Sequence, residues 1–256
     1  IAWVTASRWS QVVVGAYLAL AAVIWLVGFA HNAFTMVTLG ANEQTTTAVV
    51  PRLLAACLLV AASIVYRWRR ARSAALGYVI LLASFSIALA AAYQRAGTHM
   101  WGWAWITAVA LGGSALLHLA LLHPVEWQVA HRMPAAVLPG YAIAAILIAI
   151  SALGSRVLDS EAMAWPAGQI AIAWLLIAAG IYLVVCTAVG LRAVSPVHRV
   201  QGYLLGGALL IGFLPLGLWA TQPWPPARAQ PANVLLPSVV PCLLLGYTMF
   251  RFRVNG

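Results

Sequence analysis

The sequence predicts an all-α, polytopic membrane helix bundle of about eight transmembrane helices with both termini in the cytoplasm. Of the 256 residues, 64% are hydrophobic and only 7% are charged, whereas soluble domains are about half apolar and a quarter charged. A helix that crosses a bilayer needs about 20 residues, so this length holds about eight spans and short connections. The basic residues also fall mainly on one side of the alternating loops, as the positive-inside rule requires.

The first four spans are apolar runs bounded by charge, by polar segments or by tryptophan. The first, 12–30, ends at a polar segment without an A-x-A cleavage site, so it reads as a membrane helix and not as a secretory signal. The second, 49–66, stops at an arginine cluster, Arg67–Arg72. The third, 74–92, follows that cluster, and the fourth, 101–122, ends at His123 and Pro124.

The other four spans lie at 134–153, 164–191, 202–221 and 233–250, so residues 1–256 form one integral membrane bundle. Glycines in the fourth span at 112 and 113 and in the seventh at 202, 206 and 207 permit close helix approach. In the last span, Pro237 and Pro241 predict a kink or a helix start near 237–241, with a regular helix after it. Pro241 is therefore a candidate pivot for coupling to the cytoplasmic exit.

Arginine accounts for all 14 basic residues, and its distribution sets the orientation. With the N-terminus inside, ten arginines are cytoplasmic and four are external, which supports cytoplasmic ends. We therefore expect a bacterial inner membrane protein whose Arg67–Arg72 cluster meets anionic lipid headgroups. The net charge of +10 is then explained by contact with membrane lipids, which are the expected partners. No nucleic-acid partner is expected.

Several function classes are disfavoured by what the sequence lacks. Without lysine, neither a retinal Schiff base nor pyridoxal chemistry is available. All four acids lie outside the predicted spans, which disfavours coupled ion transport and leaves no acid pair for a metal-dependent lipid enzyme. No nucleotide, metalloprotease or hydrolase motif is present, and no metal site is predicted. The three cysteines, Cys57, Cys186 and Cys242, read as small buried hydrophobes.

His118 is the main candidate inside a span, because ionisable groups at membrane depth are often functional. Its structural interpretation is a hydrogen bond across helices, with Ser195 or Thr187 as candidate partners near the inner boundary. Its functional interpretation is an axial ligand for a haem or chlorin, or a proton-sensitive switch. A second axial histidine is not evident, because the others fall in outer or cytoplasmic segments: His31, His99, His123, His131 and His198.

Arg52 and an aromatic group are the remaining candidates. Arg52, at the start of the second span, is expected to extend to the headgroups, with a pair to Glu43 as the alternative. Trp101, Trp103 and Trp105 begin the fourth span, and with other tryptophans they are expected to form an interfacial belt. The alternative is that these three tryptophans and Tyr93 wall a pocket for a hydrophobic ligand.

Three stretches resemble the multi-pass N-terminal membrane regions of bacterial sensor histidine kinases and related signalling proteins. The stretches are LLHLALLHP at 116–124, SPVHRVQGYLLGGALLIGFLP at 195–215 and VVPCLLLGYTMFRFRVNG at 239–256. The resemblance implies a two-component sensor module whose final helix leads to a cytoplasmic kinase region. The sequence departs from the family at His123, where an aromatic residue is more usual. It also contains no phospho-accepting helix and no ATP-binding region, so kinase activity is not assigned to these residues.

Two functions from different classes follow. The first is a receptor-like module that responds to a lipid, a small hydrophobic molecule or the state of the membrane through its last helix. The second is an accessory transmembrane subunit of a larger complex that holds a lipid or pigment. A homodimer or a larger membrane assembly is expected in either case, and the identity of any cofactor stays open.

Overall fold

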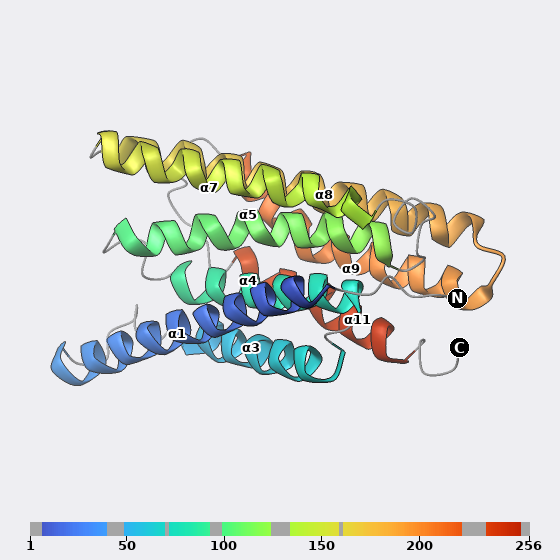
Figure 1. Cartoon of the computed structure of the whole chain (residues 1–256), viewed down its shortest axis with the longest axis horizontal. Helices are drawn as coiled ribbons and strands as arrows, with labels where there is room; N and C mark the ends of the chain where they lie inside the picture. The colour runs from blue at the N-terminus through green and yellow to red at the C-terminus, as the bar shows by residue number, and fades with distance from the viewer. Residues whose placement is uncertain are drawn as a thin grey trace.

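In the computed structural model, the described residues are 7–39, 49–69, 72–92, 99–123, 134–158, 161–221 and 234–251, and every regular element within them is helical (Figure 1). The first four α-helices are α1 (Arg8–Leu39), α3 (Val49–Arg69), α4 (Ser73–Ala92) and α5 (His99–Leu122). The others are α7 (Leu138–Leu158), α8 (Glu161–Arg192), α9 (Pro196–Ala220) and α11 (Val239–Arg251). Short 3-10 turns precede two of them, η1 (Pro134–Val137) before α7 and η2 (Leu236–Ser238) before α11.

Each of the eight predicted spans falls on a helix, and the chain is a multi-pass membrane protein. Within the described residues, seven helices are long and apolar enough to cross a bilayer. The eighth apolar segment, Leu236–Met249, is shorter than these. Its 14 residues extend about 21 Å as an α-helix, against a hydrocarbon thickness of about 30 Å. The described part of the chain therefore has the expected eight apolar helices, of which the last is shorter than the other seven.

The helices pack around α4, which lies in the middle of the bundle (Figure 1). On one side α4 contacts α1 and α3, and on the other it contacts α5. From α5 the packing continues through α8 to α9 and then to α11, which returns to contact α4. The long helix α7 packs on the outside, against α5 and α8. α4 therefore contacts its sequence neighbours α3 and α5 and also α1 and the distant last helix, α11.

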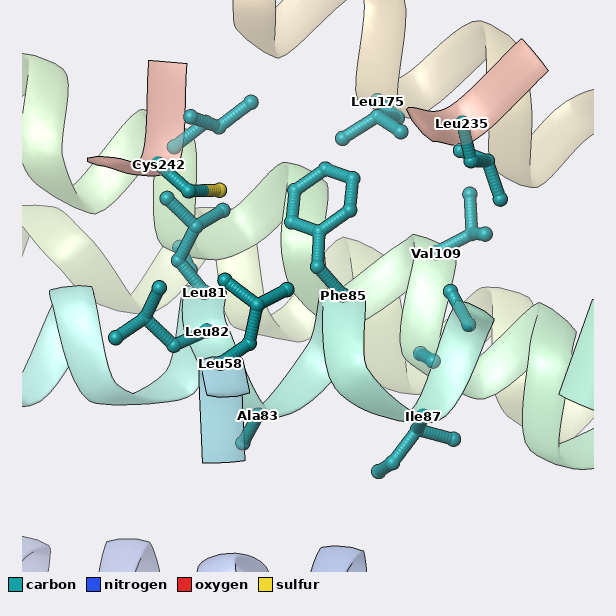
Figure 2. Packing of buried hydrophobic residues seen from close by; sticks show 14 of the residues in the cluster. Leu58, Leu81, Leu82, Ala83, Phe85, Ile87, Val109, Leu175, Leu235 and Cys242 are labelled. Atoms are coloured by element: carbon teal, nitrogen blue, oxygen red, sulfur yellow. The ribbon is translucent and has the colours of Figure 1, made fainter. Parts of the chain in front are cut away.

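Small side chains explain why so many helices can approach α4. Alanine, serine and glycine dominate its sequence, SAALGYVILLASFSIALAAA, and 18 of its 20 residues are buried. The larger residues fill the space between helices, as Figure 2 shows for Leu81, Leu82 and Phe85. The ring of Phe85 packs against Phe213 of α9, with 6.1 Å between the centroids.

Glycines bring α8, α9 and α11 together, as the small-residue pattern predicts. A Cβ atom added at Gly202 would lie 2.5 Å from the carbonyl oxygen of Cys186 and 2.6 Å from the backbone nitrogen of Gly190. At Gly212, an added Cβ would lie 2.6 Å from the ring of Pro241. Only glycine allows both approaches, since a real Cβ almost never comes so close to another heavy atom. Gly207, by contrast, has no neighbouring atom within 4 Å of such a Cβ.

Most of the described arginines gather at one end of the bundle, which we call the basic end. Helices alternate in direction, so the start of α1 and the end of α11 lie at this same end (Figure 1). The arginines at this end lie in the helices or directly beside one, and they are Arg8, Arg67, Arg69, Arg72, Arg192, Arg199 and Arg251. This arrangement agrees with two chain ends on one side of the membrane, and the cytoplasmic assignment of that side rests on the positive-inside rule.

The last helix begins as its prolines predict. The turn η2 contains Pro237, and the regular α-helix starts at Val239. Pro241 then falls in the first turn of α11, where its missing N–H removes no internal hydrogen bond of that helix. A helix start near 237–241 with a regular helix after it is confirmed.

Candidate functional site

His118 lies at the meeting point of three helices near the basic end. Its side chain is buried, at 6% exposure. Nε2 is 3.0 Å from the Ser73 hydroxyl of α4, and Nδ1 is 3.0 Å from the Tyr141 hydroxyl of α7. The Tyr141 ring also meets the imidazole edge to face, with 5.8 Å between the centroids. We call His118, Ser73 and Tyr141 the His118 node.

The node is closely packed on its α4 side. A Cβ atom at Gly77 would lie 3.2 Å from Cγ and Nδ1 of His118, so the glycine provides the space for the ring. A neutral imidazole has one donor and one acceptor nitrogen, and each hydroxyl can complement either one. The node therefore satisfies the histidine with side chains from two neighbouring helices.

The expectation that His118 bonds across helices is confirmed, but the partners suggested from the sequence were wrong. Thr187 donates instead to the carbonyl of Leu183 in its own helix, at 2.8 Å. The error arose because depth along the membrane was the only available guide, and depth does not tell which helix faces His118. Both ring nitrogens already have hydroxyl partners, so axial ligation of a haem or chlorin would require one of these hydrogen bonds to break.

A second histidine, His123, lies in the bundle although the sequence placed it in a cytoplasmic segment. Its backbone N–H continues α5 with a bond to the Leu119 carbonyl, at 2.7 Å. The side chain is 1% exposed, and Nδ1 is 3.0 Å from the hydroxyl of Tyr182 in α8. In the sequence, Pro124 marks the end of the membrane span, so His123 directly before it was expected to lie outside the bundle. His118 of α5 and His123 directly after α5 are thus each hydrogen-bonded to a tyrosine of another helix.

Arg52 corrects a second expectation, because its side chain does not extend to the headgroups. Arg52 is 5% exposed and lies inside the bundle, in the first turn of α3. Its carbonyl accepts a hydrogen bond of 3.1 Å from the indole of Trp25 in α1. The sequence shows Arg52 near a helix end, but only the tertiary structure shows that its side chain is buried. The alternative pair with Glu43 falls outside the described residues.

The aromatic group at the start of α5 does not behave as one interfacial belt. Trp105 is completely buried, Trp103 is half-buried, and Trp219 at the end of α9 is also buried. The belt expectation is therefore wrong for Trp105, because its ring packs in the core. Tyr93 and the side chain of Trp101 lie outside the described residues, so the pocket that these four residues would wall stays a prediction.

Pro241 fixes the position of α11 against its neighbours. Its ring is buried and packs on Gly212 of α9. The next residue, Cys242, accepts a hydrogen bond of 2.8 Å at its carbonyl from the hydroxyl of Tyr78 in α4. Gly246, one turn later, lies against the same hydroxyl, where an added Cβ would be too close. The proline is therefore a packing contact beside the link between α4 and α11.

The polar side chains of α4 connect it to four other helices. Ser73 meets His118 of α5, and Tyr78 reaches α11. Ser84 is 2.9 Å from the hydroxyl of Tyr17 in α1. Ser86 donates to the Ala55 carbonyl of α3, at 2.8 Å. Ser73 and Ser84 lie about three turns apart on nearly the same face of α4, whereas Tyr78 and Ser86 lie on other faces. A search for single catalytic motifs does not detect such a set.

Two of the three cysteines are buried as expected, Cys186 and Cys242, whereas Cys57 is exposed. No cluster of three or more histidine, cysteine, aspartate or glutamate residues able to hold a metal ion occurs in the described part of the chain. Comparison with protein-family models, with curated proteins and with solved structures finds no match. The resemblance to sensor-kinase membrane regions therefore stays a prediction.

Proposed function

We propose that this chain is a membrane-embedded sensor module that passes a displacement of its helix bundle through α11 to a cytoplasmic domain outside this sequence. The observation that carries the proposal is the double attachment of α4. Ser73 binds the His118 node at one point of α4, and Tyr78, five residues later, binds the α11 carbonyl of Cys242. One helix thus joins α5 and α7 to the last helix of the chain.

The mechanism needs a helix that can adopt two positions, with a stimulus that favours one of them. A displacement of α5 or α7 would change the two hydrogen bonds of His118 and so shift the start of α4. Tyr78 would carry that shift to α11. Helix shifts of about 1–2 Å are typical of such transitions.

The proposal also covers location, stimulus and assembly. We assign the module to a bacterial inner membrane, with the basic end in the cytoplasm and with a homodimer or larger complex as its working form. The stimulus is the state of the membrane or a hydrophobic molecule dissolved in it. The arginine asymmetry supports the orientation, and the high apolar content supports a stimulus within the lipid phase.

Pulsed electron spin resonance in nanodiscs tests the relay. In a Cys57→Ser background, spin labels on Val60→Cys of α3 and Leu243→Cys of α11 use two exposed positions. The distance is measured in phosphatidylcholine with 14-carbon and with 22-carbon chains, because bilayer thickness is a defined membrane state. We expect the mean distance to differ by about 2 Å between the two lipids.

The Tyr78→Phe variant removes the hydroxyl and should abolish that difference. A control, Tyr66→Phe, removes a comparable bond between α3 and α1 and should preserve it. An identical distance in both bilayers would contradict the relay, as would an unchanged difference in Tyr78→Phe.

The orientation has a separate test. Ser7 is exposed just before α1, so a Ser7→Cys, Cys57→Ser variant can be treated with a membrane-impermeant maleimide in intact cells. We expect labelling only after the cells are permeabilised. Rapid labelling of intact cells would reverse the orientation.

A further inference from the structure

The start of α1 and the end of α3 form a patch of exposed arginine and tryptophan at the basic end. The patch consists of Arg8 and Trp9 from α1 and Arg67 and Trp68 from α3. Trp9 is 80% exposed and Trp68 is 70% exposed. Both arginines are also exposed. Four large or charged side chains therefore extend from two adjacent helices without being covered by the bundle.

Two hydrogen bonds fix the register of these helices. Trp25 of α1 donates to the carbonyl of Arg52 in α3, and Tyr66 of α3 donates to the carbonyl of Gln11 in α1, at 3.1 and 2.8 Å. The two contacts are equally far apart in both helices, as expected for a regular antiparallel pair. Continuing this register brings Trp9 level with Trp68, and Arg8 level with the last turn of α3.

The residues next to the patch are apolar, so the patch lies at the border between a polar and an apolar part of the helix surface. One turn further into the bilayer, α1 exposes Val12 and Val13 and α3 exposes Ile64, with Val60 one turn beyond it. Indole rings prefer the headgroup level of a bilayer, so the two tryptophans mark the boundary between headgroups and acyl chains. The arginines then lie where phosphate groups are found.

The charge at this end has no acidic counterpart within the described residues. Glu161 is the one acidic residue among them, and it begins α8, which reaches Arg192 only at its other end. Guanidinium groups bind phosphate oxygens in a bidentate geometry. A basic group next to a bilayer attracts anionic lipids at about 1 kcal/mol per arginine.

From this geometry we infer that Arg8, Trp9, Arg67 and Trp68 form a binding site for the headgroup of an anionic phospholipid. The two guanidinium groups hold the phosphate, the indoles flank it, and the valine and isoleucine side chains contact the acyl chains. The site lies on α1 and α3, away from the His118 node and α11. Its existence does not depend on the proposed relay.

Native mass spectrometry of lipids retained by the purified protein tests this site. The protein is equilibrated in mixed micelles of phosphatidylcholine and phosphatidylglycerol at several ratios, and the preference for phosphatidylglycerol is measured. The Arg8→Gln, Arg67→Gln variant should lose about fivefold in preference per arginine. The Arg8→Lys, Arg67→Lys variant should recover only part of it, because lysine keeps the charge but lacks the bidentate geometry of the guanidinium group.

The matched control is Arg192→Gln, Arg199→Gln, which removes the same charge from exposed positions at the same end. We expect the control to keep the lipid preference of the wild type. An equal loss in both double variants would show a general charge effect and would overturn the site. No loss in the Arg8, Arg67 variant would overturn it as well, and a thermal melt confirms that each variant is folded.

Discussion

The helices α4 and α1 look alike in sequence and differ in position. Both contain an apolar stretch that is long enough to cross a bilayer. In the structure, 94% of the residues in the apolar stretch of α4 are buried inside the bundle, whereas only 17% of those in the apolar stretch of α1 are buried. Overall hydrophobicity therefore does not tell a central membrane helix from one that faces lipid, because lipid and protein interior are similarly apolar.

Side-chain size and hydroxyl groups separate the two helices. More than half of the α4 residues are alanine, serine or glycine, which let several neighbours approach. α1 exposes large aliphatic residues instead, among them Val13, Leu20 and Leu26. The serines of α4 also find partners on other helices, including Tyr17 of α1 itself. Small residues on every face of a span, with hydroxyls among them, thus mark the centre of this bundle.

The largest effect is expected from added volume in α4. Ala83 is fully buried, so Ala83→Leu should cost about 1–3 kcal/mol through overpacking. Ala19→Leu in α1 is the matched control, because Ala19 is exposed, and its effect should lie within about 0.5 kcal/mol. The fraction of folded protein after heating in detergent measures both. Equal losses would remove the distinction between the two helices.

His118→Ala should have the next largest effect. It removes two interhelical hydrogen bonds, and such contacts within membranes are worth about 0.6–2 kcal/mol. Ser73→Ala combined with His118→Ala in a double-mutant cycle should be less destabilising than the sum of the single variants, because both remove the same bond. Additive effects would show that this bond contributes no measurable stability.

The His118→Ala variant also distinguishes the proposed sensor function from the alternative function as an accessory subunit. A structural His118 leaves the absorption spectrum of the gently purified protein unchanged on mutation to alanine. A visible band that disappears in His118→Ala would identify the histidine as a pigment or haem ligand. That result would favour the function as a pigment-holding accessory subunit over the function as a sensor.

A smaller effect is expected for Tyr78→Phe, which removes the bond to the Cys242 carbonyl but keeps the ring. We expect a loss of about 0.6 kcal/mol, the average for such bonds in a membrane protein. Tyr66→Phe at the margin between α1 and α3 should cost less, because its hydroxyl is only partly buried. Thermal stability in the same detergent gives the comparison, and the reverse order would contradict the central position of α4.

The smallest effect is expected for Thr187→Ala. The threonine is exposed and bonds only within α8, so its loss should change stability by no more than about 0.5 kcal/mol. Combined with His118→Ala, it should be additive. Measurable coupling between the two would restore the partner that the sequence suggested for His118.

The sequence by itself determined the class of the molecule and the approximate position of its helices. Apolar runs bounded by charge or proline predicted the spans, because a segment must be apolar for about 20 residues to cross a bilayer. The prolines predicted the start of the last helix for an equally local reason, the missing backbone donor. Such properties depend on neighbouring residues, which the sequence shows directly.

Only the tertiary structure decided which helix is central, which hydroxyls meet His118 and that Arg52, His123 and Trp105 are buried. Each of these depends on the rotation of a helix about its axis and on the neighbour it faces. Spans that are apolar all round carry no amphipathic stripe to set that rotation. Close approaches such as Gly202 against Gly190, together with bonds such as Tyr78 to Cys242, fix rotation and partner, because they join residues far apart in the chain.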